Sequence, residues 1–207
     1  MYVKGLRNSF CVQFEVFIRK CEASDLPMME WEGAFTMHRE IIRETFERQL
    51  RGEVLMLVAE ANGFPIGQIW IDFLKAQQSN AGYLWALRVI APFRRRGIGR
   101  MLIESAEQIL KDSGVVFARL GVERDNTLAM ALYQRLGYQN VGTLDEKIRF
   151  KAPDGYWHTQ ISHEFLMEKA LVLPSNSQNS RVARNKAREE NANAVLLEGS
   201  EEAVLPA

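Results

Sequence analysis

One stretch of the sequence, Tyr83 to Leu110, constrains the fold more than any other. Its first part is apolar and β-branched, as in a buried strand. Pro92 then ends that strand, because proline cannot donate a hydrogen bond to a sheet ladder. From Ile98 onward the apolar residues recur at helical spacing. The stretch therefore predicts a strand, a glycine-containing turn and a helix in direct succession.

The turn between this strand and helix has the composition of an anion-binding site. Three consecutive arginines, Arg94 to Arg96, precede Gly97 and Gly99, and Arg100 follows. Backbone N–H groups in the first turn of a helix have no intrahelical acceptor, and glycine lets an anion approach them closely. Guanidinium groups add charge and paired donors that suit phosphate oxygens. Glycines alone would indicate only a turn, but their combination with the arginines favours a phosphate site.

Common nucleotide-binding motifs do not fit this turn. The chain has no Gly-Lys-Ser/Thr of a Walker A loop, and Leu102 stands where a dinucleotide fingerprint needs Gly or Ala. The pattern Arg94-x-x-Gly97-x-Gly99 instead resembles the pyrophosphate-binding motif of the GNAT superfamily of N-acetyltransferases, Gln/Arg-x-x-Gly-x-Gly/Ala. In that family the motif binds acetyl-CoA, and main-chain groups of the preceding strand hold the pantetheine arm.

A second block of the sequence resembles the same family. The family pattern Val-x-x-x-Asn-x-x-Ala-x-x-Leu-Tyr, followed by Gly and an aromatic residue, is matched throughout. The matching residues are Val122, Asn126, Ala129, Leu132, Tyr133, Gly137 and Tyr138. Both motifs stand at the expected junction of strand and helix, so the chain is identified as a member of the superfamily over about Val16 to Leu173.

Alternation and turn signals predict the strands, with Asn62-Gly63 as a hairpin turn. The predicted strands are Phe10–Arg19, Glu53–Glu60, Pro65–Phe73, Tyr83–Ile90, Val115–Val122, Gln139–Phe150 and Ile161–Leu171. The resemblance implies a single α/β (α+β) domain over residues 1–173. Its mixed, mostly antiparallel twisted sheet would have about six to seven strands, splayed between the fourth and fifth and flanked by about four helices.

Helical periodicity predicts the helices besides the one after Gly99. Residues between Asp25 and Arg51 are rich in helix formers and predict two helices, broken near Gly33. Their apolar stripe is Phe35, Ile42, Phe46 and Leu50. A further helix begins after Asn126 and ends at Gly137, with Leu128, Ala129, Leu132 and Leu136 as its predicted buried face.

Composition argues against several classes of function. The formal net charge is zero, so the chain as a whole does not attract nucleic acid or an anionic membrane. No apolar run has the length of a signal peptide or membrane span, and Cys11 and Cys21 have no metal-ligand spacing. We therefore expect a cytoplasmic protein that uses no metal, and a homodimer stays open. Residues 174–207 are polar and lack aromatic side chains, so we expect a disordered tail there.

The resemblance also implies the chemistry. Acetyl-CoA would lie between the fourth and fifth strands, where a primary amine of unknown identity attacks the thioester directly. Tyr133 stands at the family position of the residue that protonates the departing thiolate. The residues implied to bind the cofactor are Leu87, Arg88, Val89, Arg94, Arg95, Arg96, Gly97, Ile98, Gly99, Arg100, Asn126, Ala129 and Tyr133.

The general base is the point where the sequence departs from the family. Many relatives carry a glutamate on the fourth strand, but Tyr83 to Leu87 contains no carboxylate. Relatives that acetylate peptide N-termini often have Glu where this chain has Gly121. Glu123, Asp72 or an ordered water chain remain, and we predict Glu123 as the catalytic partner of Tyr133. The missing carboxylate on the fourth strand also favours an alternative function, a non-catalytic acyl-CoA-binding regulator with the same fold, and Gly121 counts against a ribosomal-protein or N-terminal acetyltransferase.

Overall fold

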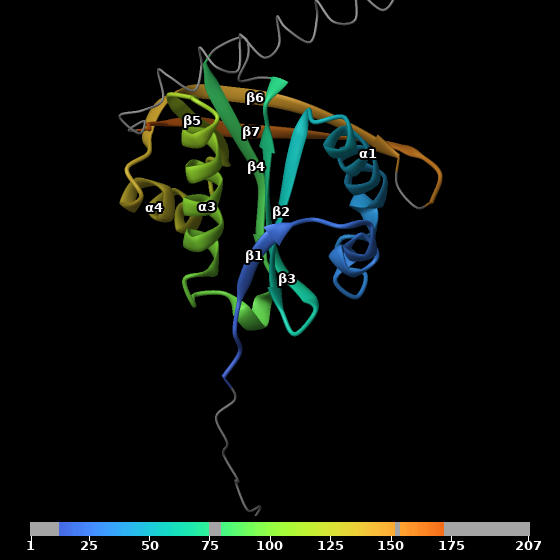
Figure 1. Cartoon of the computed structure of the whole chain (residues 1–207). Coiled ribbons are helices and arrows are strands. Elements are labelled where there is room, and N and C mark those ends of the chain that lie inside the picture. The colour runs from blue at the N-terminus through green and yellow to red at the C-terminus, as the bar shows by residue number, and fades with distance from the viewer. Residues whose placement is uncertain (1–12, 75–79, 152–153, 172–207) are drawn as a thin grey trace, which may run out of the picture.

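The computed structural model describes residues 13–74, 80–151 and 154–171, and its strands form one seven-stranded sheet in the order β1-β2-β3-β4-β5-β7-β6 (Figure 1). The strands are β1 (Phe17–Lys20), β2 (Val54–Ala61), β3 (Phe64–Asp72), β4 (Ala81–Val89), β5 (Phe117–Glu123), β6 (Gln139–Lys151) and β7 (Trp157–Ala170). All neighbours are antiparallel except β4 and β5, which are parallel. The predicted mixed sheet is confirmed, and six of its strands lie near their predicted positions. The predicted first strand is too long, because residues 13–16 are not in a strand and β1 begins at Phe17. Cys11, the first residues of the predicted first strand and the tail from 174 lie outside the described residues.

Helices cover both faces of this sheet. The helix α1 (Arg39–Leu50) lies on one face, and α3 (Ile98–Asp112) and α4 (Thr127–Arg135) lie on the other (Figure 1). The prediction of two α-helices between Asp25 and Arg51 was wrong. Before α1 the chain forms only the short 3-10 helices Ala23–Asp25, Met28–Glu30 and Thr36–His38. The cause is a run of left-handed residues, Trp31, Glu32 and Gly33, whose positive φ angles end any helix.

Two predicted helix faces also need correction. Leu50 is 71% exposed and Leu128 is 69% exposed, although both were predicted to be buried. Each residue lies in the terminal turn of its helix, where the sheet no longer covers the side chain. Ile42 at the centre of α1 is buried, as the periodicity predicts.

The main core lies between the sheet and α3. The buried face of α3 consists of Ile98, Leu102, Ile103, Ala106 and Leu110, which pack on apolar residues of β2 to β5. A smaller cluster on the opposite face joins α1 to Met56, Trp70 and Trp85. Burial of one Leu or Ile side chain contributes about 1.5–3 kcal/mol, so these two clusters hold β3 and β4 firmly from both sides.

The parallel pair β4–β5 separates part of the way along. Its register runs from Ala81 opposite Phe117 only as far as Leu84 opposite Leu120, although both strands continue beyond that point. Two residues after Leu84 comes Ala86, which has a positive φ of 53°, and the register between β3 and β4 shifts at the same place. This bulge turns β4 away from β5. The predicted splay between the fourth and fifth strands is confirmed.

Gly82 tests the close packing of α3 on the paired part of β4. A Cβ built on Gly82 would overlap the side chain of Leu110, which is fully buried and has no room to move. We expect Gly82→Ala to lower the free energy of unfolding by about 1–3 kcal/mol in urea denaturation, because it overpacks the core. Gly142→Ala is the matched control, since an added Cβ there has no described atom within 4 Å. Equal stability of the two variants would contradict this packing.

Candidate active site

The turn before α3 presents an open helix N-terminus. Gly97 is the N-cap of α3, with φ 86° and ψ −8°, a conformation that favours glycine. No side chain of the described residues caps this helix. The backbone N–H groups of Ile98, Gly99 and Arg100 therefore have no intrahelical acceptor and are free for an anion. The Ile98 side chain is buried in the core, which fixes the turn to the body of the protein.

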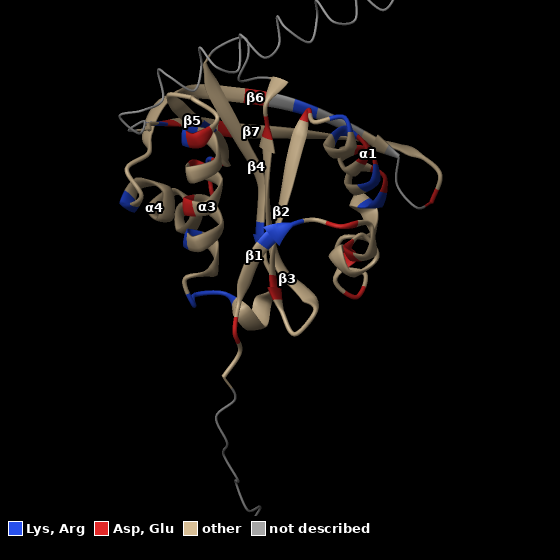
Figure 2. Cartoon of the chain, in the orientation of Figure 1, with Lys and Arg blue, Asp and Glu red and all other residues tan. Residues whose placement is uncertain are grey.

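The arginines of this turn keep most of their charge uncompensated. Arg94 Nε donates to the carbonyl oxygen of Val89 at 2.8 Å, and Arg96 Nε donates to that of Pro92 at 3.4 Å. Arg100 pairs with Glu104 at 2.8 Å, whereas no described carboxylate pairs with Arg94, Arg95 or Arg96. Figure 2 shows this basic segment at the start of α3. The predicted anion site thus combines an open helix N-terminus with unpaired guanidinium groups.

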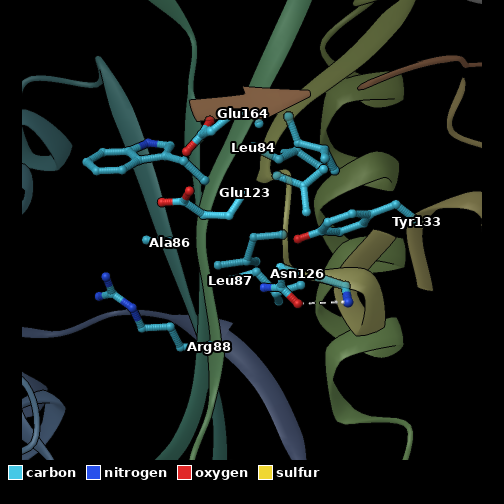
Figure 3. Close-up of a pocket in the computed structure, with 14 residues that line it drawn as sticks. Leu84, Ala86, Leu87, Arg88, Glu123, Asn126, Tyr133 and Glu164 are labelled. Atoms are coloured by element: carbon cyan, nitrogen blue, oxygen red, sulfur yellow. Dashed lines mark hydrogen bonds between the residues drawn. The ribbon is translucent and has the colours of Figure 1, made fainter. Parts of the chain in front are cut away.

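A cavity of about 300 Å³ lies where β4 and β5 separate (Figure 3). Its wall comes from β4, β5, α4 and β7, and includes Leu87, Arg88, Glu123, Asn126, Ala129, Tyr133 and Glu164. Asn126 caps α4, because its side-chain oxygen accepts a hydrogen bond from the Ala129 N–H at 3.1 Å. The predicted N-cap of α4 is therefore confirmed, and it stands on the cavity wall.

Tyr133 carries a protonated hydroxyl into this cavity. The residue is only 7% exposed, and its hydroxyl points toward the gap between the strands (Figure 3). Burial, together with a smaller effect of the Glu164 charge, raises the pKa of Tyr133 to about 12. The phenol therefore keeps its proton at neutral pH and is available as a donor.

Two glutamates face each other across β5 and β7, although the sequence singled out only one. Glu123 and Glu164 form the last pair of the β5–β7 ladder. The Ser162 hydroxyl lies 2.8 Å from Glu123 Oε1 and 2.7 Å from Glu164 Oε1. Sequence reasoning missed Glu164 because strand pairing, and not local spacing, brings it to the site. The register of β7 against β5 is the signal that would have found it.

A second cavity, of about 510 Å³, lies on the α1 side of β4 and meets the first one at these glutamates. Trp70, Trp85, Arg88 and Ser162 are among its lining residues. The Arg88 guanidinium lies 4.5 Å from the centre of the Phe35 ring, and burial lowers the pKa of Arg88 to about 10. The Arg88 side chain points away from Tyr133 (Figure 3) and lies on the side of the larger cavity, although Arg88 also borders the smaller cavity.

Asp72, the other carboxylate considered as a base, has a structural role. Its Oδ2 accepts a hydrogen bond from Arg48 Nη2 at 2.8 Å, and its Oδ1 accepts one from the Leu74 N–H at 3.0 Å. Asp72 lines only the larger cavity, whereas Glu123 and Glu164 line both cavities. Glu123 and Glu164 are therefore the better placed candidates.

The predicted cofactor residues divide into two groups. Leu87, Arg88, Asn126, Ala129 and Tyr133 line the smaller cavity. Val89 and the segment from Arg94 to Arg100 lie outside its lining, along the end of β4 and the start of α3. The two groups are adjacent, because a Cβ built on Gly99 would lie 3.7 Å from Leu132 Cδ2 of α4.

Two further properties concern the described residues only. In ranges 13–74, 80–151 and 154–171, no group of three or more His, Cys, Asp or Glu residues is arranged to hold a metal ion. Within the same part of the chain, no helix combines the length and the apolar character that crossing a membrane requires.

Comparisons with known proteins agree with this fold. The PaiA N-acetyltransferase of Thermoplasma acidophilum, solved in complex with coenzyme A, is 21% identical, with a TM-score of 0.55 over 75% of this chain and 99% of that chain. A ribosomal-protein-alanine N-acetyltransferase of Brucella melitensis is 23% identical, with a TM-score of 0.58 over 75% and 99%. An N-acetyltransferase of Staphylococcus aureus is 19% identical, with a TM-score of 0.60 over 76% and 99%. The model of the acetyltransferase (GNAT) family matches residues 21–138, more than half of the chain and both motifs, so the protein belongs to this family.

Proposed function

We propose that the protein is an N-acetyltransferase, which transfers the acetyl group of acetyl-CoA to a primary amine by direct attack in a ternary complex. The observation that carries this proposal is the cavity at the parting of β4 and β5, with a protonated tyrosine on one side and glutamates on the other. An acid and a proton acceptor on opposite sides of one gap suit an acyl transfer that needs both.

Acetyl-CoA fits the donor groups along this gap. Past Leu84 the β5-facing side of β4 has lost its strand partner, so main-chain groups from Leu87 to Val89 on that side, other than the Val89 carbonyl that accepts from Arg94, can hydrogen-bond a pantetheine arm. The N–H groups of Ile98 to Arg100 and the unpaired arginines suit a pyrophosphate. Asn126 and Ala129 border the space between these two regions. When bound, acetyl-CoA would supply an activated acyl group.

Each residue then has a defined chemical task. A glutamate facing both cavities accepts a proton from the acceptor nitrogen, which frees its lone pair for attack on the acetyl carbon. Tyr133 donates its proton to the sulfur as the carbon–sulfur bond breaks. The larger cavity, lined by Trp70 and Trp85 on its apolar side, would hold the acceptor in line with the acetyl group.

A non-catalytic acyl-CoA-binding protein is the second candidate. It is favoured by one observation, the absence of any carboxylate on β4 itself. The two functions differ in one measurement. An acetyltransferase releases free thiol from acetyl-CoA when spermidine, tobramycin, L-lysine or a short peptide with a free N-terminus is added, whereas a binding protein does not.

The acceptor and the cellular setting belong to the same proposal. We propose a primary amine as the binding partner, and neither nucleic acid nor membrane, since the formal net charge is zero. A cytoplasmic location and a homodimer also stay predictions.

Gly99 tests acetyl-CoA binding at the helix N-terminus. We expect Gly99→Glu to abolish binding in calorimetry, because its carboxylate would repel the pyrophosphate. Gly99→Ala is the matched control and should stay folded, since its Cβ makes an ordinary contact at 3.7 Å. Acetyl-CoA at about a hundred times its dissociation constant should stabilise the wild type by roughly 2.7 kcal/mol in a thermal melt with EDTA. If saturating acetyl-CoA leaves the melting temperature of the wild type unchanged, that result would count against the whole proposal.

Substitution of Tyr133 tests whether this residue is the proton donor. We expect Tyr133→Phe to lower kcat by about 10²-fold and leave acetyl-CoA affinity unchanged, because only the hydroxyl is lost. Tyr138→Phe is the matched control, since this buried tyrosine lines neither cavity described above. Because the raised pKa of Tyr133 is about 12, the donor loses its proton only near that pH. The pH–rate profile of the wild type should therefore show no decline below about pH 10 that is caused by ionisation of Tyr133. Equal kcat for both variants would make Tyr133 a packing residue.

A further inference from the structure

We propose that Glu164 of β7 is the general base of this protein and occupies the place that Gly121 leaves open on β5. This inference rests on the proposed acetyl transfer and adds a residue that neither sequence motif contains. Gly121 is the position at which the sequence lacks an expected carboxylate, and the structure supplies a carboxylate there from a different strand.

Gly121 leaves room for the Glu164 carboxylate. A Cβ built on Gly121 would overlap Oε2 of Glu164 and lie 2.8 Å from its Cδ. Gly121 has no positive φ, so the backbone does not demand glycine at this point. The requirement is one of space, because any side chain at 121 would expel the carboxylate. Gly121 also follows Leu120, the last β5 residue paired with β4, so this space lies at the opening between the strands.

Polar groups from several elements surround the Glu164 carboxylate. Ser162, two residues earlier in β7 and 2% exposed, lies 2.7 Å from Oε1. The Tyr83 hydroxyl of β4 lies 2.9 Å from the Cβ position of Gly121 that Oε2 overlaps. Glu123 lies opposite it in β5, and Tyr133 of α4 lines the same smaller cavity. The carboxylate is therefore held on one oxygen by Ser162, while Oε2 lies over Gly121 on the same side as the Tyr83 hydroxyl.

Glu164 is better placed than Glu123 for this task, although both line the two cavities. Glu123 is the last residue of β5, whereas Glu164 reaches back over Gly121 toward the start of the separation. Its charge is also the one that acts on Tyr133. Base and acid thus flank the same point, the base on the acceptor side of β4 and the acid on the cofactor side (Figure 3).

The proton balance of the reaction closes with these two groups. Oε2 of Glu164 accepts one proton from the ammonium form of the acceptor, and the lone pair freed on the nitrogen forms the new bond to the acetyl carbon. The carbon–sulfur bond breaks, the thiolate takes the proton of Tyr133, and the nitrogen gives its remaining extra proton to the Tyr133 phenolate. Proton exchange with solvent then restores the Glu164 carboxylate. Ser162 is a positioning residue, because its hydroxyl contacts the Glu164 carboxylate and takes no part in the transfer. Its single proton can be donated to only one of the two glutamates at a time.

The first test compares three glutamine variants of the full-length protein by thiol release from acetyl-CoA with the amine panel named above. We expect Glu164→Gln to lower kcat/KM by about 10²–10⁴-fold at neutral pH, with a smaller loss at higher pH where solvent deprotonates the amine. Glu123→Gln should lose less than about tenfold. Glu168→Gln is the matched control, because this β7 glutamate pairs with Arg119 at 2.6 Å and lines neither cavity described. A wild-type rate for Glu164→Gln, or a larger loss for Glu123→Gln, would overturn the assignment.

Gly121→Ala provides a second test, which leaves the glutamate itself in place. The added methyl group would displace the Glu164 carboxylate, so we expect a loss of kcat/KM similar to that of Glu164→Gln. Acetyl-CoA should still raise the melting temperature of this variant as it does for wild type. A fully active Gly121→Ala protein would show that the position of this carboxylate is irrelevant to the reaction.

A crystal structure with acetyl-CoA gives a result that needs no acceptor. We expect a Glu164 oxygen to lie within hydrogen-bond reach, directly or through one water, of the space in front of the thioester carbonyl carbon. If acetyl-CoA is bound but the Glu164 carboxylate lies on the far side of β7 from the thioester, this assignment is overturned while the proposed function stands. Failure of acetyl-CoA to bind the wild type would overturn the proposed function, and this inference with it.

Discussion

The hydrogen-bond ladder between β4 and β5 ends at Leu84 and Leu120, and both cavities open from that point. Unpaired backbone groups inside a protein are costly, so a sheet does not part without a compensating force. Here β4 stays paired to β3, and β5 stays paired to β7. The buried face of α3 and the tryptophans on the opposite side hold the strands in these pairings. The gap is therefore a consequence of the strand pairing and of the packing on both faces of the sheet.

The positions of most helices and strands could be predicted from the sequence because their signals are local, whereas the arrangement of the sheet was implied by the resemblance to the GNAT superfamily. The arginine–glycine turn, the Asn62-Gly63 hairpin and the Asn126 cap each depend on residues a few positions apart, and the structure has all three features. The errors arose where the backbone leaves regular geometry, as in the left-handed run at Trp31, or at helix ends such as Leu50.

The candidate base could not be predicted in the same way. Glu164 reaches Gly121 only because β7 pairs antiparallel with β5 in one particular register. A shift of that register by one residue would turn Glu164 to the other face of the sheet. The site is also costly to the fold, since two glutamates directly opposite each other on neighbouring strands repel. Left-handed backbone at Ala86 and Arg95 adds strain in the same region.

The two cavities lie on opposite faces of the sheet and meet only through its gap, which has a consequence for the order of events. Because the cavities open on opposite faces of the sheet, a ligand in one cavity does not block the entrance to the other. In the proposed acetyl transfer, either product could then leave while the other is still bound, and no covalent acyl-enzyme intermediate would be needed. Double-reciprocal plots of initial velocity at several fixed concentrations of the second substrate should therefore intersect and not run parallel.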